Sequence, residues 1–389
     1  MVVPSAYATG FAKAALIDPS LASRYTQHTN VGDEQADALM TRINGDPRGN
    51  HWIKLGMDGD LTALEDAPAE VRDFFEQVRV VPEWWLPDES LAGCRAFHRH
   101  TEMFLAAFVG AVLIEGFSTL ISKSFSITGK VMDNGVQRLK QNNRHLVEIF
   151  MPGGMDQEAD GWKLSVRIRL MHARVRLLLN QSDEWDHAAW GVPLSAAHIA
   201  FAAAGFSGLL LKRAEMLGVH LSAQEQASFM MIWRYSGHLM GVVPELLFTD
   251  RESALRLQRV GALCEPAPSL ESCQMAHSLV NAAPVVSGVT DLRDHRKLAR
   301  KIYGISRELI GHDLADQLNY PKRQAFNPLI WFRWGSHIDQ WLRKVLPPLA
   351  RSRRTGQFQL MVSLSHYDTD RIRYAVPEKL HAETEHRQH

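Results

Sequence analysis

One histidine lies inside an apolar stretch that is crowded with arginines. The stretch is RIRLMHARVRLLL, residues 167–179, and its histidine is His172. Apolar residues recur there at spacings of three or four, which places them on one helix face with His172 at its edge. A neutral imidazole in an apolar pocket is a common iron ligand, and a cationic rim suits the acid groups of a porphyrin. The same letters also fit an amphipathic helix with a hydrogen-bonded core histidine. The arginines, mainly on the other faces, are Arg167, Arg169, Arg174 and Arg176.

Two further segments carry polar side chains at helical spacing. His238 lies in WRYSGHLMGVVPELL, residues 233–247, and is a candidate second ligand, a buried hydrogen-bonding histidine or part of a channel. The neighbouring glycines allow a helix or a flat cofactor to approach closely. Arg138 and Asn142 are one helical turn apart on one face, where they would meet either a small ligand such as dioxygen or solvent. Periodicity leaves these alternatives open.

Several common catalytic signatures are absent from the sequence. There is no G-x-x-x-x-G-K-[ST], no G-x-G-x-x-G after a strand, no H-E-x-x-H and no G-x-S-x-G. The three cysteines, Cys94, Cys264 and Cys273, form no C-x-x-C pair, which argues against a cysteine zinc site or a disulfide scaffold. Nucleotide-binding proteins, zinc proteases and serine hydrolases therefore lose most of their support.

Composition narrows the class of protein further. Hydrophobic residues make up 46% of the 389 residues, and the formal net charge is zero, which argues against a nucleic-acid-binding protein. The apolar runs 103–114 and 199–211 are shorter than the about 20 residues that span a bilayer, so we expect no transmembrane segment. The N-terminus lacks a secretory signal pattern, so we expect a cytoplasmic protein, or an exported one if a leader preceded these residues. We also expect a monomer.

We expect helices to position these side chains, because few segments alternate apolar and polar residues with the period of two that is typical of strands. The spacing predicts an all-α protein. No repeat or domain boundary appears, so we expect an N-terminal arm over 1–30, one helical domain over 31–375 and a polar tail over 376–389. Predicted helices cover 33–45, 65–78, 88–122 with a break at Gly110 or Gly116, 130–151, 158–181, 194–217, 222–247, 251–263, 268–285, 291–312 and 327–347.

Some helix ends have a local cause. Ser222 and Glu225 are three residues apart and predict a capping box that opens a helix. Ser195, two residues after Pro193, is a candidate N-cap. The run Pro-Gly-Gly at 152–154 predicts the end of the preceding helix, because it cannot continue one.

Five sequence blocks resemble a known family in order and spacing. They are Thr128-Gly129 followed by the helix of Arg138, then RxRLMHARVR, WGVPLS, GFSGLLLKRAEMLGVHLSAQE and WRYSGHLMGV, over roughly residues 88–250. In these blocks the chain is similar to the rubber oxygenase (latex-clearing protein) catalytic domain, shared with fungal endoplasmic-reticulum-bound oxygenases. The resemblance implies a globin-like all-α core with additional helices that binds haem b, and no C-x-x-C-H for covalent attachment is present.

The resemblance also implies roles for single residues. His172 would be the proximal iron ligand, and Arg138 matches the distal-helix arginine of the family. Asn142 stands where the family has a threonine, and Gln141 stands where latex-clearing proteins carry a lysine. The proposed carboxylate base of the family falls on Ser122 by spacing. The nearest acid upstream is Glu115, which makes Glu115 a candidate for proton abstraction.

The leading hypothesis is a haem b-dependent dioxygenase. Dioxygen would add across a carbon–carbon double bond of an isoprenoid, polyisoprenoid or other hydrophobic substrate and give two carbonyl products. Arg138 and Asn142 would polarise or position the oxygen. One alternative is a haem-binding protein without oxygenase turnover, such as a sensor, a carrier or a weak peroxidase, which the changed distal residues favour. Another is a cofactor-free helical interaction protein.

Overall fold

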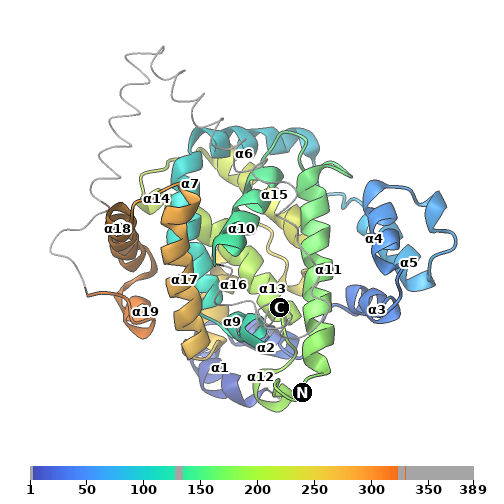
Figure 1. The fold of residues 1–389 in the computed structure, drawn as a ribbon, viewed down its shortest axis with the longest axis horizontal. Helices are drawn as coiled ribbons and strands as arrows, with labels where there is room; N and C mark the ends of the chain where they lie inside the picture. The colour runs from blue at the N-terminus through green and yellow to red at the C-terminus, as the bar shows by residue number, and fades with distance from the viewer. Residues whose placement is uncertain (1–2, 128–134, 323–328, 330–389) are drawn as a thin grey trace, which may run out of the picture.

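The protein is built from helices alone in the part of the chain that the structure describes. The computed structural model describes residues 3–127, 135–322 and 329, and these ranges contain helices, turns and irregular segments but no strand (Figure 1). The predicted all-α class is confirmed. The predicted helix 327–347 apart from Leu329, the tail 376–389 and the Thr128-Gly129 turn lie outside the described residues.

The helices follow one another with short connections. In the first half they are α1 (Ala8–Ala15), α2 (Pro19–His28), α3 (Glu34–Arg42), α4 (Gly49–Asp58), α5 (Ala69–Val78), α6 (Pro87–Arg99), α7 (Thr101–Ala107), α8 (Leu113–Phe117), α9 (Ile121–Ile127) and α10 (Gly135–Ile149). The others are α11 (Asp160–Asn180), α12 (His187–Trp190), α13 (Ala196–Ala204), α14 (Leu210–Met216), α15 (Ala223–Leu239), α16 (Arg251–Cys264), α17 (Leu270–Val286), α18 (Leu292–Ile310) and α19 (His312–Gln317). The segment 1–30, expected to be an arm, thus contains α1 and α2, which pack on α16.

The predicted helix ends with a capping mechanism are confirmed. The Ser222 hydroxyl accepts from the backbone N–H of Glu225, and the Glu225 carboxylate accepts from the N–H of Ser222. Ser195 caps α13 in the same way, with His198 as its reciprocal partner. Helix α10 ends at Ile149, just before the Pro-Gly-Gly run. Local hydrogen-bonding patterns therefore located these ends without any tertiary information.

The predicted helix 88–122 is broken at a different place from the glycines. Helix α6 ends at Arg99, and the chain turns through 82° before α7 begins at Thr101. Gly110 lies instead inside a π-helix, Phe108–Val112, that continues α7 into α8. The expected break at Gly110 or Gly116 was wrong, because the α6–α7 bend is made by the backbone of His100, which leaves helical geometry. Among the described residues no single helix is long and apolar enough to cross a membrane. Taken together, the bent pair of α6 and α7–α8 has the length and the apolar composition of a membrane span.

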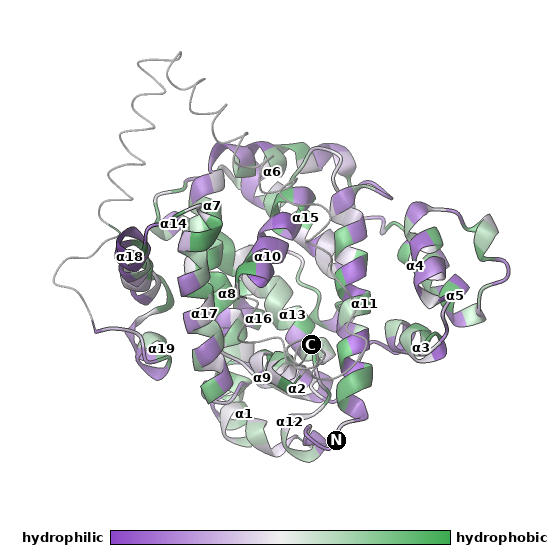
Figure 2. Cartoon of the chain, in the orientation of Figure 1, coloured by the Kyte–Doolittle hydropathy of each residue, from purple (hydrophilic) through white to green (hydrophobic). Residues whose placement is uncertain are grey.

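The core lies between the helices that carry the predicted site. Helix α15 packs closely along α6, α10 packs on α17 and α11, and the long helix α11 forms one flank of the molecule (Figure 1). Helix α3 packs on α11, while α4 and α5 project beyond it as a small lobe. Apolar residues concentrate on the helix faces that point inward (Figure 2). The site helices α10, α11 and α15 are therefore held from several sides.

A close approach between α6 and α15 depends on a glycine. A Cβ added at Gly93 would lie 2.8 Å from the backbone nitrogen of Phe229, closer than real contacts allow. Gly93→Ala is therefore expected to push the helices apart and to lower the free energy of unfolding by about 1–3 kcal/mol. Gly116→Ala is the matched control: its Cβ would meet no atom within 4 Å, so stability should rise by at most about 1 kcal/mol. Chemical denaturation measures both, and equal stabilities would contradict the packing argument.

Candidate functional site

Arg138 and His172 stand on two helices that pack against each other, α10 and α11. The two helices run antiparallel, and a hydrogen bond of 3.0 Å joins His145 Nε2 on α10 to Ser165 Oγ on α11. Seven residues from this bond along each helix, in opposite directions, stand Arg138 and His172. Since seven residues are close to two helical turns, both lie roughly on the face that carries the bond. The register therefore predicts a similar height on the two helices for Arg138 and His172, the residues expected to flank a ligand.

His172 has the properties of a neutral metal ligand. Its ring atom Nδ1 is buried and has no hydrogen-bond partner among the described residues. Burial lowers the pKa of His172 to about 3, and the positive charge of Arg176 adds to this effect. The imidazole is therefore uncharged at neutral pH, which is the form that binds iron. A core histidine held by hydrogen bonds would have had its ring nitrogens satisfied, so this alternative from the sequence loses support.

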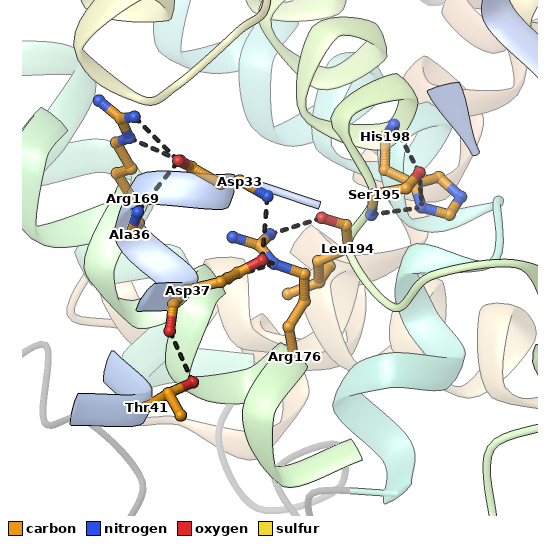
Figure 3. Close-up of polar contacts among 9 residues, drawn as sticks. All are labelled: Asp33, Ala36, Asp37, Thr41, Arg169, Arg176, Leu194, Ser195 and His198. Atoms are coloured by element: carbon orange, nitrogen blue, oxygen red, sulfur yellow. Dashed lines mark hydrogen bonds and ion pairs between the residues drawn. The ribbon is translucent and has the colours of Figure 1, made fainter. Parts of the chain in front are cut away.

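At least three of the four arginines around His172 contact α3 or the turn after it: besides Arg169 and Arg176, Arg174 donates to the Asn44 side-chain oxygen. Arg169 binds both carboxylate oxygens of Asp33, at 2.6 and 2.8 Å, and Arg176 Nε lies 2.8 and 3.0 Å from the carboxylate oxygens of Asp37 (Figure 3). Burial alone would raise the pKa of Asp33, but the hydrogen bonds and charge of Arg169 outweigh it and lower the pKa. These contacts tie α3 and the turn after it to α11, so at least three of the four arginines expected to surround a porphyrin bind protein groups instead.

The Arg176 guanidinium also holds the loop before α13. Its Nη1 donates to the carbonyl oxygen of Leu194 at 2.8 Å, while Nη2 is buried and has no partner among the described residues. Leu194 itself has a φ of 43°, a conformation that is rare for a leucine. Backbone hydrogen bonds from Val192 N–H to the Thr29 carbonyl and from Ala196 N–H to the Val31 carbonyl join this loop to the segment between α2 and α3. The loop that contains WGVPLS, residues 190–195, is thus held in place by the buried guanidinium of Arg176.

A narrow crevice adjoins His172 on the side of these ion pairs. It is lined by Gly32, Asp33, Arg169, His172, Arg176, Ala196, Ile199, Met240 and Gly241. Charged and apolar side chains share this lining, and the crevice is too narrow to hold a macrocycle. It reaches α15 through Met240 and Gly241, which follow His238.

The predicted distal pair on α10 is already engaged with protein groups. Arg138 is buried and its guanidinium carbon lies 4.1 Å from the ring centre of Phe125 on α9. The Asn142 side-chain amide donates to the Arg138 carbonyl oxygen at 2.9 Å, one turn back along the helix. Some of the polar atoms of Arg138 and Asn142 thus already interact with protein groups.

His238 lies in an aromatic cluster at the end of α15. Its ring stacks on Tyr235 with centroids 6.3 Å apart and meets Trp84 edge-on at 6.2 Å. Burial lowers its pKa, and the charges of Arg169 and Arg234 act in the same direction. His238 is thus a neutral histidine near the crevice wall, and its role toward a cofactor stays a prediction.

The two positions considered for a catalytic base are both occupied by structural contacts. Glu115 on α8 is buried and forms an ion pair with Arg213 on α14, with a second contact of 3.3 Å from Arg213 Nε to Oε2. Burial raises the pKa of Glu115, while the charge of Arg213 opposes the rise. The Ser122 hydroxyl donates to the Thr119 carbonyl and lies 2.9 Å from Ser272 Oγ. Proton abstraction by Glu115 stays a prediction, and its ion pair favours a role in joining α8 to α14.

Sequence reasoning missed a buried polar junction of α10, α11 and α15, which lies about two helical turns from His172. His145 Nε2 lies within hydrogen-bond distance of Ser165 Oγ on α11 and of Ser236 Oγ on α15, at 3.0 and 3.3 Å. The two serine hydroxyls are themselves 3.0 Å apart. The junction therefore joins the three site helices. The available signal was the position of His145, seven residues after Arg138 on the same face of the predicted helix.

A second buried junction, also missed, attaches the N-terminal helices. Tyr7 and Glu265 both lie close to His198 Nε2, at 2.9 and 3.4 Å, and Tyr25 donates to the Glu265 carboxylate at 2.7 Å. Burial raises the pKa of Tyr7 and Tyr25 well above the usual value, and the charge of Glu265 adds to the rise. The contacts span much of the sequence, so no local pattern could have indicated them.

Stability should fall in acid because His145 is buried in its neutral form. Burial lowers its pKa to about 3, whereas the unfolded chain has a value of about 6.5. Between these pH values the unfolded state binds more protons than the folded state. The free energy of unfolding is therefore highest above about pH 6.5, as far as His145 is concerned, and decreases as the pH falls toward 3. His145→Gln should make the pH dependence shallower by up to about 1.4 kcal/mol per pH unit in this range. Urea denaturation from pH 7 to 4 tests it, and an unchanged slope would contradict the assignment.

The described residues fit a porphyrin held by a single histidine in their donor chemistry. His172 supplies a neutral imidazole without a hydrogen bond at Nδ1, on a helix whose inner face is apolar. Within the described ranges no group of three or more histidine, cysteine, aspartate or glutamate side chains lies together as a metal site.

Comparison with known proteins gives one consistent result. The family model described as ER-bound oxygenase mpaB/B'/Rubber oxygenase, catalytic domain, matches residues 95–338, more than half of the chain. The rubber oxygenase of Streptomyces sp. (strain K30) is 23% identical over 320 residues, which are 78% of this chain and 74% of that protein. The solved structure of latex clearing protein LCP in the closed state superposes with a TM-score of 0.61 at 17% identity, covering 90% of this chain and 94% of that chain, and so shares the fold. The chain therefore belongs to the ER-bound oxygenase/rubber oxygenase catalytic-domain family.

Proposed function

We propose that this protein is a haem b-dependent dioxygenase that cleaves carbon–carbon double bonds of an isoprenoid substrate, polyisoprene included. The observation that carries the proposal is His172, a neutral imidazole with an unpartnered buried nitrogen, inside the region that matches an oxygenase family. The name of the Streptomyces relative supports a polyisoprene substrate.

Bound haem b would supply the activation of dioxygen, which no protein side chain provides. His172 would hold the group through a ring nitrogen, and the ion pairs of Arg169 and Arg176 would keep α11 in place behind it. Arg138 would provide a positive charge on the facing helix, and the Asn142 amide fixes the turn that carries Arg138. Apolar side chains would exclude water and orient the alkene.

One observation favours the second candidate, a haem-binding protein without turnover. Asn142 donates to the Arg138 carbonyl and the Arg138 guanidinium stacks on Phe125, so both predicted distal residues already have protein partners. A sensor or carrier needs no distal group that is free to act on oxygen.

Oxygen uptake separates the two candidates. The haem-loaded protein, supplied with a polyisoprene latex or with squalene, should consume oxygen and release products that carry aldehyde and ketone groups, seen by mass spectrometry. Saturated squalane is the control and should give no uptake. Binding of haem without substrate-dependent uptake would exclude the oxygenase and support the carrier or sensor.

A further inference from the structure

Helix α18 carries a cationic face that points away from the core. Successive helical residues are rotated by about 100°, so one side of α18 collects five basic side chains, and all five are exposed. Within the described residues no ion pair involves any of them. They are Arg293, Arg296, Lys297, Arg300 and Lys301.

The opposite face of the same helix is apolar and fixes its orientation. Ala299, Leu309 and Ile310 are buried, and α18 packs on α17 and on the π-helix Phe108–Val112. Arg307, the basic residue nearer the C-terminal end, is buried and donates to Asp316 and to the Pro321 and Tyr320 carbonyls. The exposed cations are therefore presented outward by a helix that cannot rotate without leaving the core.

An apolar tip adjoins this cationic face. The turn between α17 and α18 exposes Val285 (49%) and Leu292 (62%). Gly288, between them, has a φ of 77°, and a Cβ added there would meet nothing within 4 Å, so the turn projects into open space. Exposed aliphatic side chains next to a row of cations are typical of surfaces that insert shallowly into a lipid headgroup layer.

The basic surface is local, because the chain as a whole has a formal net charge of zero. Helix α18 is among the most hydrophilic helices of the molecule on its outer side and lies at its edge (Figure 2). We propose that α18 and the α17–α18 turn form a peripheral docking surface for a bilayer that carries anionic lipids. Each cation near such a surface adds to the attraction, and the aliphatic tip adds apolar contact. This surface is independent of the cofactor and of the reaction.

A nucleic acid is the less suitable partner for this surface. The exposed aliphatic side chains at Val285 and Leu292 have no role against a phosphate backbone. A lipid surface uses both the charges and the aliphatic groups. The observations therefore favour the bilayer.

Vesicle co-sedimentation tests the proposal with the full chain. Phosphatidylcholine vesicles are compared with vesicles that also contain about 30 mol% phosphatidylglycerol, at low and at physiological salt. The charge-reversal variant is Arg296→Glu with Arg300→Glu. The matched control reverses two exposed cations on α1 and α16, Lys13→Glu with Arg259→Glu. A third variant, Leu292→Asp, removes the apolar part of the surface. Circular dichroism and thermal unfolding confirm that each variant is folded.

The wild type and the control should bind the anionic vesicles and release them as salt rises. The α18 variant should bind at least about ten-fold more weakly, and Leu292→Asp should be weakened with little change in salt dependence. Equal binding by the α18 variant and the control would overturn the proposal, as would equal binding of wild type to neutral vesicles. Binding of the wild type to a short DNA duplex but not to vesicles would overturn it in favour of a nucleic-acid partner.

Discussion

Replacing His172 by alanine should remove both the cofactor and the activity. Among the histidines that the structure describes, His172 combines a neutral imidazole with a buried ring nitrogen that has no hydrogen-bond partner. Loss of groups that merely orient a metal ligand costs about 10–100-fold, so loss of the ligand itself should lower substrate-dependent oxygen uptake at least about 100-fold. The protein should remain folded, because the substitution removes no hydrogen bond within the described residues.

The measurement is oxygen uptake with squalene, together with the haem absorbance retained after gel filtration. His98→Ala is the matched control: its Nε2 lies 2.9 Å from the Phe150 carbonyl, so its loss should cost about 1 kcal/mol of stability and no haem. An active, coloured His172→Ala protein would mean that another residue holds the iron, and His238 would then be the first residue to replace.

Replacing Arg176 by alanine should have the largest effect on stability. Its side chain is only 2% exposed, and it joins Asp37 on α3 to the Leu194 carbonyl before α13. Removing one partner leaves the Asp37 carboxylate and a backbone carbonyl without their cation, for which the usual cost is about 3–5 kcal/mol. Because Asp37 is 33% exposed and regains some water, we expect the lower end, about 3 kcal/mol.

Denaturant unfolding at pH 7 measures this loss. Arg167→Ala is the control on the same helix: the side chain is exposed, and the change should stay within about 0.5 kcal/mol. If the two variants were equally stable, the contact of Arg176 with α3 and the WGVPLS loop would not contribute to folding. A double mutant with Asp37→Asn should recover part of the loss, since it removes the unpaired charge.

Local patterns explain why much of the fold was predictable from the sequence. Helical periodicity, the capping box of Ser222 and Glu225 and the Pro-Gly-Gly run each depend on residues within one or two turns. The bend at His100 was not predictable in this way, since it follows from how α6 packs on α15 and α7 on α14. The glycines that seemed natural breaking points instead lie within helices.

The sequence predicted individual residues of the candidate site but not the contacts between them. His172 and Arg138 were found from residue type, spacing and the family resemblance. The ion pairs of Arg169 and Arg176 join residues that are more than 130 positions apart in the sequence. The sequence therefore indicated a cluster of arginines but not the carboxylates that bind them. The junction of His145, Ser165 and Ser236 depends in the same way on three helices meeting.

Titration of the purified protein with hemin shows whether His172 binds the iron of a haem. We expect saturation at about one haem per chain, with a strong Soret band whose shape indicates histidine ligation, and a loss of tight binding in His172→Ala. If the wild type shows no saturable binding, or if His172→Ala binds hemin as tightly and with the same spectrum, then His172 is not the ligand of a haem and the proposed function fails.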